Sequence, residues 1–142
     1  MAAYSWTDAN VVPAAGSTIY SALVAAGVTI TPGMPCILNS DGEIIKAGAA
    51  TADLSGAGTS PKSILISLTS ATAGQPVSYV QSGDVAYGAI FTVGAQVYLG
   101  ATAGELVPFG DLTTGNFITY VGYATTTSNL RLNPVKQGIA LP

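Results

Sequence analysis

The chain has 142 residues, a formal net charge of −3, no histidine and one cysteine, and only 8% of its residues are charged, against roughly 25% in an average globular domain. The scarcity of groups that titrate near neutral pH argues against an enzyme, and the four scattered basic residues argue against binding to nucleic acid or to an anionic membrane. No run approaches the roughly 18 consecutive apolar residues of a membrane span, and the N-terminus lacks a basic start. We therefore expect a soluble protein that is not exported by the general route.

Residues 1–16 show no regular alternation, and we predict that they form an N-terminal arm, leaving residues 17–142 as the β-rich domain. The arm holds the single tryptophan, Trp6, with Tyr4 two positions before it. Aromatic side chains of this kind anchor interfaces because they supply apolar area with few rotatable bonds. We expect the arm to be mobile in the isolated protein and to contact a partner through Tyr4 and Trp6. The alternative is a terminus without a role.

The segment 17–26 fits two kinds of element. Ser17 is a good N-cap for a short helix that ends before Gly27. The threonine, isoleucine, tyrosine and valine content of the same segment favours a strand equally. At most one short helix is therefore expected in the chain.

The clearest internal pattern is a hairpin that occurs twice, over residues 33–45 and 94–107. Each copy reads Gly, two variable residues, two apolar residues and Leu, then a turn, then Gly-Glu and two apolar residues; the second turn is one residue longer. The pair Asp41-Gly42 is favoured in hairpin turns because glycine tolerates a positive φ. Segments 64–69 and 121–126, which follow the hairpins, also correspond loosely. The repeat predicts two related β units in one domain.

Further strands are predicted from alternation at residues 77–81, 117–121 and 130–132, with turns at 82–84 and 114–116. Turn signals recur about every 8 to 12 residues, a spacing typical of sandwiches and barrels. The predicted fold class is all-β: a compact antiparallel β-barrel or sandwich built from the two related units, with the extended N-terminal arm. Residues 53–61 have the composition of a loop.

The groups that could carry chemistry are few and isolated. Cys36 lies in the apolar stretch 35–38 and has no histidine to activate it, so we expect a buried, unreactive thiol. Residues 56–63 resemble a phosphate-binding loop, but Pro61 stands where that loop needs glycine, and a strand pattern follows in place of a helix. Nucleotide binding is therefore not expected.

Glu43 and Glu105 occupy equivalent positions in the two hairpins, where a pair of catalytic carboxylates is one interpretation. The simpler interpretation is that each follows a turn glycine and keeps a strand end solvated. The aspartates are dispersed singly, without the spacing of a calcium loop. Tyr79, Tyr98 and Tyr120 lie in strand patterns, which favours packing in the core or between subunits, with sugar stacking as the alternative. We predict no catalytic residue, cofactor or metal.

Four stretches, at residues 26–35, 69–77, 93–99 and 130–134, resemble the small Gly/Ala/Thr-rich head decoration (cement) proteins of tailed bacteriophages. This resemblance implies an all-β structural protein of the virion that assembles as a homotrimer on the outer surface of the mature capsid. There it clamps neighbouring coat subunits against the pressure of the packaged DNA. The resemblance carries over no catalytic residue.

The expected function is therefore capsid stabilisation by a decoration subunit, made in the host cytoplasm, whose partner is the major capsid (coat) protein. No nucleic acid, membrane or small-molecule substrate is expected as a partner. The alternative is a trimeric tail-fibre or adhesin-type binding module, which would bind a saccharide or a receptor. A small β-fold enzyme such as a lyase is a weaker rival, because titratable groups are missing. With so few charges, we expect attachment to be apolar and hydrogen-bonded rather than ionic.

Overall fold

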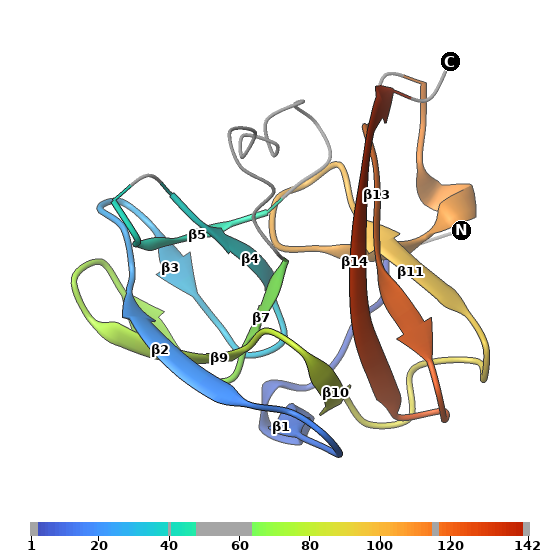
Figure 1. Cartoon of the computed structure of the whole chain (residues 1–142), viewed down its shortest axis with the longest axis horizontal. Helices are drawn as coiled ribbons and strands as arrows, with labels where there is room; N and C mark the ends of the chain where they lie inside the picture. The colour runs from blue at the N-terminus through green and yellow to red at the C-terminus, as the bar shows by residue number, and fades with distance from the viewer. Residues whose placement is uncertain (1–2, 40, 48–63, 115–116, 141–142) are drawn as a thin grey trace.

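The chain folds into antiparallel sheets packed together, with 46% of residues in strands and, among the residues that the structure describes, no helix of seven or more residues. This computed structural model describes residues 3–39, 41–47, 64–114 and 117–140 (Figure 1). Its two 3-10 helices, η1 (Asp8–Asn10) and η2 (Phe109–Asp111), have three residues each. The predicted all-β class is confirmed. Closure into a barrel is not part of this finding.

Two sheets hold most of the strands, and Figure 1 shows them on opposite sides of the molecule. Sheet A has the order β1 (Val12–Pro13), β10 (Gly83–Ala86), β14 (Asn129–Ala140), β13 (Phe117–Ala124), β11 (Gln96–Leu99) and β12 (Leu106–Pro108). Sheet B has the order β2 (Ile19–Leu23), β9 (Pro76–Val80), β7 (Leu65–Ser67), β4 (Pro35–Leu38) and β5 (Ile44–Lys46). A small third sheet pairs β3 (Thr29–Ile30) with β8 (Ala71–Thr72).

The two predicted hairpins are confirmed. Strand β4 pairs with β5, and β11 pairs with β12, each in an antiparallel ladder. The glycine before each glutamate has a positive φ, +79° at Gly42 and +90° at Gly104. Only glycine adopts this backbone conformation without strain, which explains why the repeat keeps it in both turns.

The hairpins belong to two units with the same strand order. The first unit runs β5-β4-β7-β9-β2, and the second runs β12-β11-β13-β14-β10. In chain order, each unit has one strand, then the hairpin, then two more strands. The predicted pair of related β units is therefore confirmed, and β1 is an additional strand on the second unit.

The ambiguous segment 17–26 contains a strand, β2, paired with β9 from Ile19↔Val80 to Leu23↔Pro76. The predicted turn at residues 82–84 is wrong, because β10 begins at Gly83 and the chain passes there from sheet B to sheet A. Gly83 does have a φ of +88°, but a Cβ at this position would also collide with the backbone of Gly16. The glycine is needed for a close approach between two segments.

Two apolar clusters stabilise the domain. The main core contains the inward residues of sheet A together with one face of sheet B, including Val97, Val121 and Leu130 from the former and Ile37 and Ile66 from the latter. The second cluster joins the other face of sheet B to β3 and β8. Its members are Val24, Ile30, Cys36, Ile44, Leu65, Ala71, Val77 and Tyr79. The central strands of sheet B are therefore covered on both faces, whereas its edge strand β2 is largely exposed.

Residues 3–16 lie on the β domain rather than apart from it, which corrects the expectation of a free arm. The backbone N–H of Tyr4 donates to Leu106 O at 2.9 Å, and β1 pairs antiparallel with β10. The indole Nε1–H of Trp6 donates to Pro32 O at 2.9 Å. The segment lacks a period because its contacts go to irregular positions on the domain.

Candidate interaction surface

The outer face of sheet A carries the chain's most distinctive set of exposed side chains. Alternate residues of a strand point to opposite faces. On β11, Val97 and Leu99 are buried in the main core, whereas Gln96 is exposed and Tyr98 is half-buried on the outer face. The same alternation operates on β13 and β14, so that one face of the sheet is apolar core and the other is a mixed surface.

One row across this face is polar. Strand register places Gln96 opposite Tyr123, Tyr123 opposite Arg131, and Arg131 opposite Asp84. The row therefore crosses four strands, from β11 to β10. It gathers an amide, a phenol, a guanidinium and a carboxylate on a surface with few other charges.

The neighbouring row is aromatic. Register places Tyr98 opposite Tyr120, and Tyr120 opposite Val135. The Tyr98 ring makes edge-to-face contacts with Tyr120, at 5.5 Å between ring centroids, and with Phe109, at 5.3 Å. Phe109 and Val135 are 47% and 43% exposed. We call these four residues, Phe109, Tyr98, Tyr120 and Val135, the aromatic row.

The Tyr120 phenol is a neutral hydrogen-bonding group at ordinary pH. Burial raises the pKa of Tyr120, and the nearby Tyr98 and Tyr123 phenols raise it further. The Tyr98 hydroxyl lies 3.2 Å from Gln96 Oε1. The surface thus offers apolar ring area together with uncharged donors, the combination that protein interfaces use at their centres.

Comparison of the two units shows why this face is unusual. The matching registers make Tyr98 the equivalent of Ile37, and Tyr123 the equivalent of Ile66. Ile37 and Ile66 are buried in the main core, whereas both tyrosines are half-buried on the outer face. A face that the first unit packs against the rest of the domain is thus covered by no described strand in the second.

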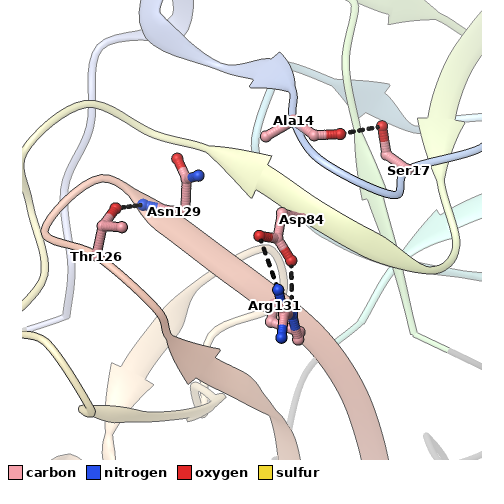
Figure 2. Close-up of polar contacts among 6 residues, drawn as sticks. All are labelled: Ala14, Ser17, Asp84, Thr126, Asn129 and Arg131. Carbon is pink, nitrogen blue, oxygen red and sulfur yellow. Dashed lines mark hydrogen bonds and ion pairs between the residues drawn. The ribbon is translucent and has the colours of Figure 1, made fainter.

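The polar row ends at β10 with an ion pair between Arg131 and Asp84 (Figure 2). Arg131 donates from Nε to Asp84 Oδ1 at 2.9 Å and from Nη2 to Oδ2 at 3.4 Å. The Asp84 side chain is only 5% exposed, while that of Arg131 is 49% exposed. The hydrogen bond to Asp84, and a second to Tyr123, raise the pKa of Arg131. The equivalent pair in the first unit is apolar, with Ile19 opposite Val80.

Replacing Arg131 by valine is expected to lower the melting temperature, because it leaves the Asp84 carboxylate buried without its partner. The double variant Asp84→Ile with Arg131→Val reproduces the Ile19–Val80 pair of the first unit and is expected to recover most of the loss. Thermal unfolding followed by circular dichroism measures both. A double variant that melts no higher than the single one would contradict this account.

Tyr4 and Trp6, the predicted partner-contact residues, are half-buried against the main core. Trp6 contacts Tyr87 edge to face at 5.1 Å between ring centroids, and Tyr4 contacts Phe91 in the same way at 5.1 Å. These aromatic side chains therefore fasten the N-terminal segment to its own domain. Their contact with a partner stays a prediction.

The other residues that the sequence analysis considered for chemistry form no reactive site among the described residues. Cys36 is buried, as expected, and burial raises its pKa from 9.0 to about 12. Glu43 and Glu105 lie in separate hairpins of different sheets, and no hydrogen bond or ion pair joins them within the described residues. Residues 56–63, with the phosphate-loop resemblance, and the whole of the 53–61 loop lie outside the described residues. Among the residues that the structure describes, no three acidic or cysteine side chains gather as a metal site requires.

Comparison of the sequence with models of known protein families and with curated proteins finds no match. Within the described ranges, no helix has the length and hydropathy needed to cross a membrane. The aromatic row is the surface that sequence reasoning misses. Tyr98 and Tyr120 are predictable as strand residues, but their contact with each other and with Phe109 depends on strand register, which no local pattern encodes.

Proposed function

We propose that the protein is a structural decoration (cement) subunit of a phage virion, which binds the outer surface of the capsid as a homotrimer and stabilises contacts between coat subunits. The observation that carries the proposal is the aromatic row, on a sheet face that no described strand covers and where Tyr98 takes the place of the buried Ile37 of the first unit. A permanent structural subunit needs such an adhesive face and no reaction chemistry. We propose no catalytic role and no cofactor.

The chemistry of the face favours a protein partner such as the coat protein. Phe109 and Val135 offer exposed apolar area, and the tyrosines beside them add neutral hydrogen-bond donors. Interfaces are enriched in aromatic residues and in arginine at their centres, with few other charges. The polar row, with Arg131 held by Asp84, supplies a fixed guanidinium next to the aromatic row.

The test is cosedimentation of the full-length protein with intact capsids. Phe109→Asp and Val135→Asp are each expected to weaken binding by about tenfold or more, because each places an unpaired charge in an apolar contact. The matched control is Val93→Asp, at a residue that is 62% exposed and lies outside the aromatic row. It is expected to bind like the wild type. Equal losses in all three variants would contradict the assigned surface.

Salt separates apolar from ionic attachment in the same assay. Raising the salt concentration from about 0.1 M to about 1 M shortens the Debye length from about 10 Å to about 3 Å. We expect the bound fraction to change little, since exposed ion pairs contribute only about 0–1 kcal/mol each. Release of the protein by salt alone would overturn the apolar mode of binding.

The aromatic row also favours a second candidate function, a tail-fibre or adhesin-type module that binds saccharides, because half-buried tyrosine rings on a sheet face can stack against sugar rings. The same variants distinguish the two. Saccharide binding that Phe109→Asp abolishes, together with no binding to capsids, would replace the decoration function by the adhesin function.

A further inference from the structure

Strand β2 is an uncharged strand at the edge of sheet B. It pairs with β9 on one side, and no described strand pairs with it on the other. Its residues Ile19, Tyr20 and Leu23 are 55%, 47% and 50% exposed. Natural edge strands are usually protected by charged side chains, proline or bulges, because a bare edge accepts further strands. Strand β2 has none of these protections.

The backbone of β2 shows which groups the open side offers. The N–H and C=O of Val24 both hydrogen-bond to the turn that precedes β9. Because alternate residues of an antiparallel strand direct their backbone groups to opposite sides, the outward groups of β2 are those of Ile19, Ser21 and Leu23. Within the described part of the chain, these N–H and C=O groups have no hydrogen-bond partner on that side.

The second unit shows that this position accepts a strand. Strand β10 is the equivalent of β2, and its outward residues, Asp84 and Ala86, correspond to outward residues of β2. There the N-terminal segment adds β1 in an antiparallel ladder. The N–H of Ala14 donates to Asp84 O at 2.9 Å, and the N–H of Asp84 donates to Ala15 O at 3.0 Å. In the second unit the position is filled, and in the first it is open.

We propose that β2 pairs with β2 of a second copy of this chain, antiparallel and centred on Ser21, so that two sheets B become one continuous sheet. In this register Ser21 faces Ser21, and Ile19 faces Leu23. All three pairs of outward residues then exchange both backbone hydrogen bonds. On the opposite face, the large Tyr20 lies across from the small Ala22.

The sequence of β2 selects a second copy as the occupant. The strand is self-complementary about Ser21, with apolar Ile19 against apolar Leu23 and no charge to oppose itself. An isologous two-fold contact satisfies the same edge on both copies at once. The inference goes beyond the proposed function and does not rest on it. In a homotrimer, this contact would join one trimer to the next.

Disulfide trapping of the full-length protein tests both the pairing and its register. Directly opposed residues in a hydrogen-bonded pair have Cα atoms about 5.5 Å apart, within the roughly 4.4–6.8 Å that a disulfide spans. In a Cys36→Ala background, Ser21→Cys is expected to form a covalent dimer under mild oxidation. Ala73→Cys, in the exposed turn before β9, is the control for random collision.

The register gives a sharper readout. Ile19→Cys alone is not expected to crosslink, because its two copies would lie about 13 Å apart along the paired strands. A mixture of Ile19→Cys and Leu23→Cys is expected to give a dimer that contains one chain of each. Crosslinking of Ser21→Cys no faster than Ala73→Cys, with native circular dichroism in both variants, would overturn the proposal. Equal crosslinking of Ile19→Cys with itself would also overturn it.

Discussion

Replacing Trp6 by alanine is expected to lower the free energy of unfolding by about 3 kcal/mol, toward the lower end of what truncating a large buried aromatic costs. The change removes the edge contact with Tyr87 and the hydrogen bond to Pro32 O. It also empties the space over Gly33, where a Cβ would collide with Nε1 and Cε2 of the indole ring. Urea unfolding followed by tyrosine fluorescence measures the loss.

Trp6→Phe is the control, because it keeps an aromatic ring and loses the N–H donor; it is expected to cost less than the alanine variant. Deletion of residues 2–16 also removes β1 and is expected to destabilise the domain strongly. If Trp6→Ala were as stable as the wild type, Trp6 would be available for a partner, as the sequence suggested.

Stability is expected to fall steeply in alkaline solution. Burial raises the pKa of Cys36 from 9.0 to about 12, and burial raises the pKa of Tyr87 well above its ordinary value of 10.0. The folded state therefore keeps protons that the unfolded state releases. Above the ordinary pKa of each group, 9.0 for Cys36 and 10.0 for Tyr87, unfolding becomes more favourable by about 1.4 kcal/mol per pH unit, until the folded-state pKa of that group is reached.

Denaturant unfolding from neutral pH to about pH 11 measures this dependence. In Cys36→Ala, the fall is expected to begin about one pH unit later, near the ordinary pKa of Tyr87. The Tyr87 hydroxyl donates to Gly33 O at 2.8 Å inside the core, so its contribution remains. An alkaline profile unchanged by the substitution, or labelling of native Cys36 as fast as in the unfolded chain, would contradict the account.

The hairpins were predictable because their signals are local. A glycine with positive φ, a glutamate and flanking apolar residues lie within a few positions of one another. The full length of β14 was not predictable from the sequence, because Pro134 and Gly138 are typical of strand ends. The structure accommodates the proline with a register shift opposite residues 120–122 of β13. Whether β14 continues through the proline depends on its pairing with β13, and the sequence of β14 alone does not reveal that pairing.

The interaction surface was predictable only in part, for a similar reason. Tyr98 and Tyr120 show the alternation of strand residues, but 22 positions separate them in the chain. Their contact depends on the pairing of β11 with β13, which includes a bulge at Val97/Tyr98. The position of the N-terminal segment was not predictable from alternation either. Its contacts depend on single side chains such as Trp6, which form no repeating pattern in the sequence.

The two units of the chain meet in a way that a symmetric dimer would not produce. Ile37 and Ile66 of the first unit pack against the core residues of the second. The two units therefore contact each other through different faces, in a head-to-tail arrangement. A single unit with two such faces would associate head to tail, into a closed ring or an open filament, because each contact leaves one free face at either end. Tyr123 and Arg131 lie on the face of the second unit that no described strand covers. A polar end of this kind caps a repeat array, and in the proposed function the aromatic row beside it binds the partner.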